Sequence, residues 1–151
     1  MKIHTIGFTE KSAEEFFGLL KNSGAKRVVD VRLNNVSQLA GFAKKKDLSY
    51  FVQQICGMEY VHVPELAPTK EMLVEYKKNG GQWAAFEQRF LDLLKFRNVQ
   101  DSVPREIIED GCLLCSEHTP HQCHRRLVAE YLNECWGAVE IEHHVEQRVK
   151  A

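Results

Sequence analysis

Apolar residues occur along this chain in two alternating patterns, short continuous runs and longer stretches with helical spacing. The short runs contain many β-branched and aromatic residues, a composition typical of strands. They predict five strands, at Lys2–Phe8, Arg27–Arg32, Glu59–Leu66, Gly111–Glu117 and Ala138–Val145. The third strand contains Pro64, which interrupts strand pairing because proline has no N–H to donate.

Between these runs, apolar residues recur every three or four positions, as they do on one face of a helix. Ser12 followed by Glu15 forms a capping box that opens the first such stretch, and Gly24 ends it. The other predicted helices are Asp47–Gly57, Thr69–Lys78, Gln82–Phe96 and Pro120–Trp136.

Strands that alternate with helices predict a mostly parallel sheet with right-handed crossovers. We therefore expect one α/β domain over residues 1–151, with three layers and five strands. About forty residues separate the third strand from the fourth, enough to cross back over the sheet. The pattern predicts a Rossmann-like half with strand order 3-2-1-4-5. Ligands would bind between the ends of strands 1 and 4, at Thr5–Gly7 and Cys115–Glu117.

Composition narrows the class of protein. The net charge of −1 gives no basic field for nucleic acid, so a nucleic-acid partner is not favoured. The N-terminus has no signal-peptide pattern, and no run reaches the roughly 18 apolar residues of a membrane span. We therefore expect a cytoplasmic protein without membrane contact. Its five cysteines, an odd number, are then expected to be core residues, metal ligands or reactive thiols rather than a disulfide framework.

The richest chemistry lies at residues 111–131. Alternation along the fourth strand sends Cys112 to one face and Cys115, with Glu117, to the other. This separation weakens a C-x-x-C metal or redox motif and favours Cys112 as a core residue. Cys115 fits either the core or a site at the end of the strand.

The last helix is expected to begin with a second capping box, with Thr119 at the N-cap, Pro120 at N1 and Gln122 at N3. Cys123 and His124 then fall in its first turns, where free N–H groups favour an anion or a thiolate. Arg125 adjoins them and needs an anionic partner there. His124 is either a core side chain bonded to the backbone or a site residue.

The second and third strands add further polar residues. Asp30 and Arg32 share a face and are not expected to stay unpaired, because burying lone charges is costly. They form either a structural ion pair or part of a site. His62 on the third strand fits a packed core histidine better than a site residue.

These segments resemble an uncharacterised family, domain of unknown function 488. The similar pieces are HTIGF (4–8), VVDVR (28–32), Ser37, the GF at 41–42, YVHVPEL (60–66) and LLCSEHTPHQCHR (113–125). The resemblance implies an α/β sandwich with a parallel sheet and little about a reaction. Its signature residues here are Thr5, Gly7, Asp30, Arg32, Ser37, His62, Cys115, Glu117, Cys123, His124 and Arg125. Phe8-Thr9 and Leu66-Ala67-Pro68 depart from the family's usual His-Ser and Leu-Gly-Gly, which suggests a separate substrate.

Three hypotheses remain open. In the first, a small-ligand or enzymatic site binds an anionic, phosphate-like or nucleotide-like group through Arg32 and Arg125. Glu117 and His124 would transfer protons, and Cys115 or Cys123 would act as nucleophile. The other ligand-binding residues would be Thr5, Gly7, Asp30, Ser37 and His62.

The sequence specifies no cofactor. No C-x5-R loop follows Cys115 or Cys123, which counts against phosphatase or rhodanese chemistry. No G-x-G-x-x-G follows the first strand, so a dinucleotide is not favoured. The second hypothesis is a metal site drawn from Cys115, Glu117, His118, His121, Cys123 and His124. The third is a non-catalytic structural or interaction module.

Overall fold

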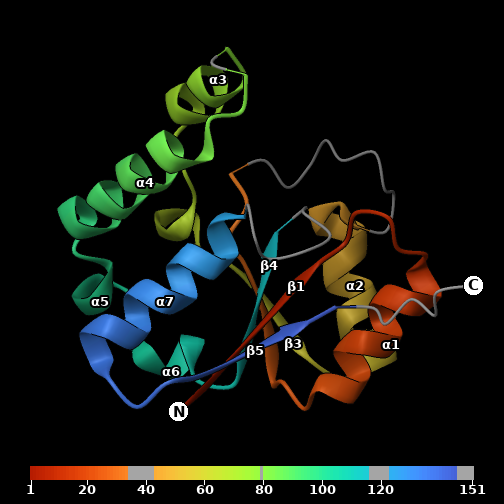
Figure 1. Ribbon diagram of the computed structural model, residues 1–151. Helices are drawn as coiled ribbons and strands as arrows, with labels where there is room; N and C mark the ends of the chain where they lie inside the picture. The colour runs from red at the N-terminus through yellow and green to blue at the C-terminus, as the bar shows by residue number, and fades with distance from the viewer. Residues whose placement is uncertain (34–42, 79, 116–122, 146–151) are drawn as a thin grey trace, which may run out of the picture.

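A five-stranded parallel sheet forms the centre of the protein (Figure 1). The computed structural model describes residues 1–33, 43–78, 80–115 and 123–145. The strands are β1 (Lys2–Gly7), β2 (Arg27–Asp30), β3 (Glu59–His62), β4 (Gly111–Cys115) and β5 (Glu140–His144). The predicted α/β class with a parallel sheet is confirmed.

The order of the strands is β3-β2-β4-β1-β5. Strand 4 lies beside strand 1, as predicted, but on its other side, between β1 and β2, so the expected order 3-2-1-4-5 is wrong. All five residues of β4 are buried and none is charged, which suits a central strand covered on both faces. The half-exposed strands β3 and β5 lie at the edges instead.

The helices occupy the connections that the sequence predicted, with small shifts at their ends. The main ones are α1 (Ala13–Ser23), α2 (Lys45–Cys56), α3 (Lys70–Lys78), α4 (Trp83–Arg97) and α7 (His124–Trp136). Short turns form α5 (Val99–Ser102), α6 (Arg105–Ile108) and the 3-10 helix η2 (Pro64–Leu66). The third strand therefore ends at His62, before Pro64, rather than at Leu66.

The side chains of the sheet form two hydrophobic cores. Helices α1 and α2 cover one face, where Ile6, Val28 and Leu114 are buried (Figure 1). Helices α4 and α7 cover the other face, with Leu113 and Leu127 in its core. Cys112 belongs to the first core and Cys115 to the second, so the predicted split of these two cysteines is confirmed.

The start of α7 differs from the prediction. The helix begins at His124, and Cys123 precedes it as an extended N-cap residue with φ −140° and ψ 138°. Cys123 is therefore not in the first helical turn, because its backbone still belongs to the segment arriving from β4. The predicted capping box at Thr119 and Pro120 lies outside the described residues.

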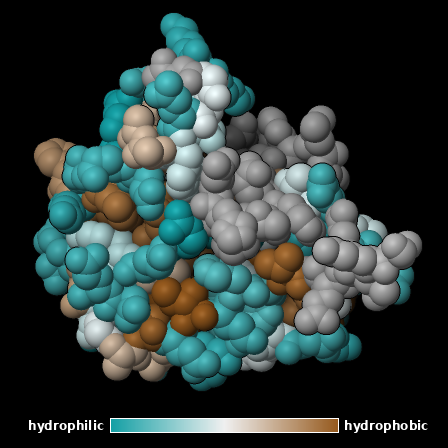
Figure 2. All heavy atoms as spheres, in the orientation of Figure 1, coloured by the Kyte–Doolittle hydropathy of each residue, from teal (hydrophilic) through white to brown (hydrophobic). Residues whose placement is uncertain are grey.

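The outer surface is mainly hydrophilic on the side that Figure 2 shows, and hydrophobic residues there form small separate groups. No helix in the described part of the chain is long and apolar enough to cross a membrane.

Candidate functional site

The carboxyl ends of the central strands bring several predicted site residues together. Strands β1 and β4 end side by side, with Gly7 in register with Cys115. The two strand ends that the sequence assigned to the ligand site are therefore hydrogen-bonded neighbours. Two predicted residues, Ser37 and Glu117, lie outside the described residues.

On the α1/α2 face, Asp30 and Arg32 form a buried ion pair. The guanidinium of Arg32 donates from Nε to Asp30 Oδ1 and from Nη2 to Oδ2, both at 2.8 Å. The backbone N–H of Arg32 adds a bond to Oδ1 at 3.1 Å, and the Tyr60 hydroxyl donates to Oδ2 at 2.5 Å. Asp30 is fully buried and Arg32 is 4% exposed. The prediction that these two charges are paired is confirmed, and we refer to Asp30, Arg32 and Tyr60 as the Asp30 group.

One nitrogen of this ion pair has no hydrogen-bond partner among the residues that the structure describes. The Nη1 atom of Arg32 is buried and makes no hydrogen bond within the described part of the chain. The ring of Phe8, which follows β1, lies 5.3 Å from the Arg32 guanidinium carbon. Buried polar atoms are almost always hydrogen-bonded, so an exception calls for a specific cause.

Two histidines hold the chain where it leaves β2. His62 Nε2 lies 2.7 Å from the Arg32 carbonyl oxygen, and His124 Nε2 lies 2.7 Å from that of Val31. A carbonyl only accepts, so each ring donates from Nε2, and a neutral ring then carries its lone pair on Nδ1. Burial lowers the pKa of His124 to about 4, which keeps its ring neutral at pH 7. His124 therefore makes the backbone bond that was one of its two predicted roles, and His62, predicted as a packed histidine, makes a bond of the same kind.

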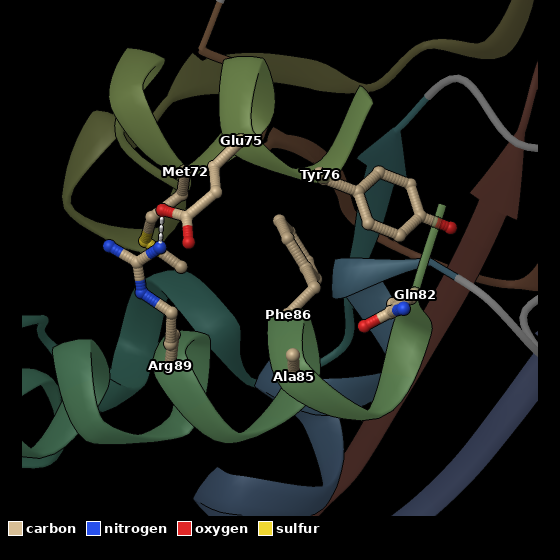
Figure 3. Close-up of a pocket in the computed structure, with 7 residues that line it drawn as sticks. All are labelled: Met72, Glu75, Tyr76, Gln82, Ala85, Phe86 and Arg89. Carbon is tan, nitrogen blue, oxygen red and sulfur yellow. Dashed lines mark hydrogen bonds and ion pairs between the residues drawn. The ribbon is translucent and has the colours of Figure 1, made fainter. Parts of the chain in front are cut away.

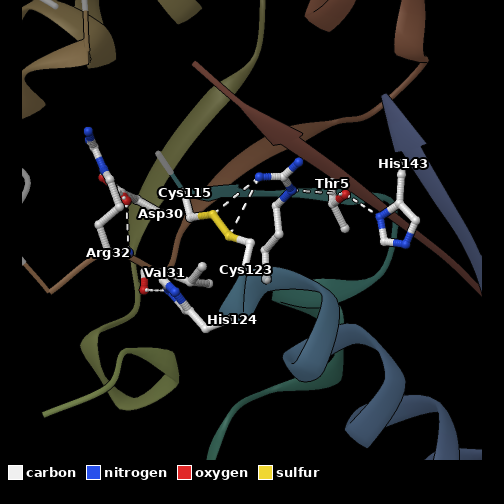
Figure 4. Close-up of a disulfide and its surroundings, with 9 residues drawn as sticks. Thr5, Asp30, Val31, Arg32, Cys115, Cys123, His124 and His143 are labelled. Carbon is white, nitrogen blue, oxygen red and sulfur yellow. Dashed lines mark hydrogen bonds and ion pairs between the residues drawn. A yellow bond between two sulfur atoms is a disulfide. The ribbon is translucent and has the colours of Figure 1, made fainter. Parts of the chain in front are cut away.

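On the α4/α7 face, a second polar group surrounds Arg125 (Figure 4). Arg125 is fully buried, although it lies in the first turn of α7. Its Nη1 donates toward the sulfur atoms of Cys115, at 3.3 Å, and Cys123, at 3.6 Å. Its Nε donates to Thr5 Oγ1 at 3.4 Å, and Thr5 Oγ1 lies 2.5 Å from His143 Nδ1. We call Thr5, Cys115, Cys123, Arg125 and His143 the Arg125 group.

The two cysteines of this group form a disulfide, with their sulfur atoms 2.06 Å apart. The expectation that the cysteines stay outside disulfides is therefore wrong for Cys115 and Cys123. Cys115 ends β4 and Cys123 is the N-cap of α7, and the fold brings these two positions together. An odd number of cysteines does not exclude one such disulfide. Cys56, Cys112 and Cys135 are free thiols. Cys112 is fully buried, as predicted, and burial raises the pKa of its thiol.

The sheet separates the two groups. Asp30 and Arg32 point to the α1/α2 face, whereas Cys115 and Cys123 belong to the α4/α7 core. The sequence had assigned both to the walls of one crevice. The structure distributes them over the two faces at the same carboxyl edge, because Asp30 and Cys115 stand at alternate positions of their strands.

Three of the residues in the metal hypothesis also lie close together here. Donor atoms of Cys115, Cys123 and His124 all lie within 4.8 Å of one another. These are three of the six residues in the metal hypothesis, and Glu117, His118 and His121 lie outside the described residues. Thiolates bind zinc whereas disulfide sulfur does not, so this ligand set would require the reduced protein.

Sequence reasoning missed three participants. Tyr60 was detectable, because it lies two residues before His62 and so shares its face. Phe8 was noted only as a departure from the family pattern. His143 gave no signal, since its contact with Thr5 depends on the register between β1 and β5, where the two residues are direct partners.

Two hollows lie away from this edge of the sheet. Figure 3 shows one between α3 and α4, where Phe86 points inward and Glu75 pairs with Arg89. Its volume of about 20 Å³ admits about one water molecule. A groove of about 720 Å³ lies between α1 and α2, and Phe17 and Phe51 line it. Neither hollow is lined by Arg32 or Arg125.

The fold and the polar carboxyl edge define an α/β protein with a parallel sheet, whose buried polar side chains gather at the edge where such sheets bind ligands. The family described as domain of unknown function DUF488 matches residues 12–132, which is about four-fifths of the chain. The chain therefore belongs to this family, as the resemblance predicted. Comparison with curated proteins and with solved structures gives no match.

Proposed function

We propose that the protein binds a small anionic ligand, with a phosphate-like or nucleotide-like group, at the carboxyl ends of β1, β2 and β4. The observation that carries this proposal is the buried Nη1 of Arg32, which makes no hydrogen bond among the described residues. A buried donor without a partner costs about 1–3 kcal/mol. An anion that accepts from Nη1 would remove this cost, which supports a ligand in the position that Arg32 faces.

The partners of Arg32 suit such a role. Asp30 and Phe8 fix the plane of the guanidinium, so little side-chain entropy remains to be lost when a ligand binds. A planar guanidinium recognises phosphate and carboxylate oxygens by its fixed N–H directions. Arg125 adds a second positive charge at the same edge, on the other face of the sheet.

The Arg125 group supports chemistry on the bound molecule. When a thiol reductant opens the Cys115–Cys123 disulfide, the adjacent guanidinium favours the thiolate over the thiol. A thiolate of Cys115 or Cys123 is a nucleophile, and the neutral His124 ring can accept a proton on Nδ1. Glu117 keeps the proton-transfer role that we predicted for it.

A second candidate function is a non-catalytic module in which the polar residues only hold the loops. The bonds from His62 and His124 to successive backbone carbonyls favour this alternative. The two functions differ in one respect, because only the first requires that a ligand contact Arg32.

Isothermal titration calorimetry with inorganic phosphate, nucleoside monophosphates and small dicarboxylates tests the proposal. We expect saturable one-to-one binding by the wild-type protein. The variant Arg32→Lys keeps a positive charge beside Asp30 but lacks the guanidinium fork, and it should bind at least about tenfold more weakly. Arg89→Lys, on the exposed surface of α4, is the matched control and should leave affinity unchanged. Equal affinity in all three proteins, or no binding to any anion, would favour the structural module.

A further inference from the structure

A third polar cluster lies away from the Asp30 and Arg125 groups, on the paired strands β1 and β5. It consists of His4, Glu142 and His144. His4 is in register with Glu142, and the next residue on the same face, Ile6, is in register with His144. The three side chains therefore share the α1/α2 face at the β5 edge of the sheet. We call them the β5-edge cluster.

The donor atoms of this cluster converge closely. His4 Nδ1 lies 2.9 Å from His144 Nε2 and 4.0 Å from Glu142 Oε2. One nitrogen or oxygen from each residue lies within 4.8 Å of the other two. The two imidazole rings stack with centroids 5.1 Å apart and an angle of 21° between their planes. Three ligand atoms thus surround one small volume.

We propose that the β5-edge cluster binds a divalent transition-metal ion of the zinc type, with His4, Glu142 and His144 as ligands and water in the fourth position. Two imidazoles and one carboxylate form a known zinc ligand set that leaves one position open. Ligands at about 2.0–2.2 Å in tetrahedral geometry stand roughly 3.4 Å apart. The two nitrogens need to separate by only about 0.5 Å to admit the ion.

The chemical state of the two rings suits this role. A hydrogen bond between two ring nitrogens requires that one of them carry no proton, so at least one ring is neutral. Burial lowers the pKa of both His4 and His144, which favours the neutral form that binds metals. In a neutral pair, the donating ring would move its proton to its other nitrogen, and both lone pairs would then face the ion.

The cluster is buried at one end and open to solvent at the other, which suits a metal site. His4 is 2% exposed and held rigidly in the sheet, whereas the side chain of Glu142 is 45% exposed. An ion can therefore enter from the Glu142 side and keep a water ligand there. Lys2 opposes metal binding, because its Nζ lies 2.6 Å from Glu142 Oε2 and would be displaced or repelled by the ion.

The test uses the full 151-residue chain without a histidine tag, freed of metal and titrated with Zn²⁺ against a chromophoric chelator. We expect one tight site per chain. His144→Ala should weaken binding on the order of 100-fold, since it removes a direct ligand. The matched control is His143→Ala, its neighbour on the other face of β5, which should bind as the wild type does. Lys2→Met should strengthen binding by up to about fivefold, the size of a surface ion pair.

Cobalt(II) separates this cluster from the cysteines of the Arg125 group. A cobalt complex of two nitrogens and an oxygen shows visible d–d absorption without the sulfur-to-metal charge-transfer band that thiolates produce. We expect that spectrum, and we expect it to disappear in His144→Ala. Three results would each overturn the proposal: no stoichiometric zinc or cobalt, binding that His144→Ala leaves unchanged, or a thiolate band that Cys115→Ser abolishes together with the bound metal.

Discussion

Two buried arginines stand at the same edge of the sheet, one on each face, and their surroundings differ. Arg32 has a carboxylate partner, Asp30, that binds it through two parallel hydrogen bonds. Arg125 donates instead to a hydroxyl and to two disulfide-bonded sulfurs. The partner of Arg32 therefore does not depend on the redox state of the cysteines, whereas reduction of the disulfide would place thiol or thiolate groups beside Arg125.

This difference suggests separate roles for the two arginines. Under our proposal, the guanidinium that Asp30 holds in place recognises the ligand through Nη1, which has no hydrogen-bond partner among the described residues. A guanidinium beside two sulfurs controls the reactivity of those sulfurs. The first face would select the ligand and the second would act on it. The following predictions separate the two faces.

Removing the carboxylate of Asp30 should have the largest effect. Asp30→Ala leaves the buried Arg32 charge without its partner, which should cost about 3–5 kcal/mol of unfolding free energy. Urea denaturation followed by circular dichroism measures this loss. The control is Glu75→Ala, which breaks the half-exposed pair with Arg89 and should cost less than about 1 kcal/mol. Equal losses would mean that the Asp30 pair is no more important than a surface pair.

His124 should make the protein less stable in mild acid. Its pKa is lowered to about 4 in the folded protein, against about 6.5 for an unfolded chain. The unfolded chain therefore takes up the proton first, and stability falls as the pH drops from 6.5 to 4. The full loss is about 3 kcal/mol.

The variant His124→Gln isolates this contribution, because every other histidine is present in both proteins. The unfolding free energy of the variant, measured at several pH values, should fall less steeply than that of the wild type between pH 6.5 and 4. Parallel curves would show that His124 is accessible to protons in the folded state.

Reduction of the disulfide on the α4/α7 face should lower the free energy of unfolding. The disulfide closes a short loop with a sequence separation of 8, worth about 2.5 kcal/mol by chain entropy. The pair between Arg125 and a thiolate would offset part of that loss. Urea denaturation with and without dithiothreitol measures the difference.

The double variant Cys115→Ser/Cys123→Ser should lose this dependence on reductant. Cys135→Ser should keep it, since Cys135 is a free thiol. A wild-type protein that is equally stable in both conditions would argue against a disulfide that contributes to the fold.

Tyr60→Phe should have the smallest effect. It removes one hydrogen bond to a carboxylate that still has Arg32, so we expect a loss of about 1–2 kcal/mol. Thermal unfolding monitored by circular dichroism is sensitive enough to detect this. A loss as large as that of Asp30→Ala would identify Tyr60, rather than Arg32, as the main partner of Asp30.

Local patterns predicted most of the fold. Ser12 is the predicted N-cap, with Ser12 Oγ accepting from the Glu15 N–H, and the side chains of β4 alternate between the two cores as expected. The order of the strands was not predictable from connection lengths. A long passage after β3 permits β4 on either side of β1, and β4 is an interior strand in both orders, so its burial does not distinguish them.

The candidate site was predictable where its residues lie close in the sequence. Such pairs stand within a few positions of each other in the sequence, as do Asp30 with Arg32 and Cys123 with Arg125. Contacts between strands could not be predicted, because the Thr5–His143 bond and the β5-edge cluster depend on the register between β1 and β5. Strand alternation could indicate the face of a residue but not its partner.

The central claim is that Arg32 contacts an anionic ligand, and nuclear magnetic resonance of ¹⁵N-labelled arginine side chains tests it most directly. We predict that the Nε and Nη signals of Arg32 shift saturably as a nucleoside monophosphate is added. The signals of Arg97, which donates to the backbone carbonyls of Glu65 and Ala67, should not move. Arg32 signals that stay unchanged up to saturating ligand, or that shift only as much as those of Arg97, would contradict the claim.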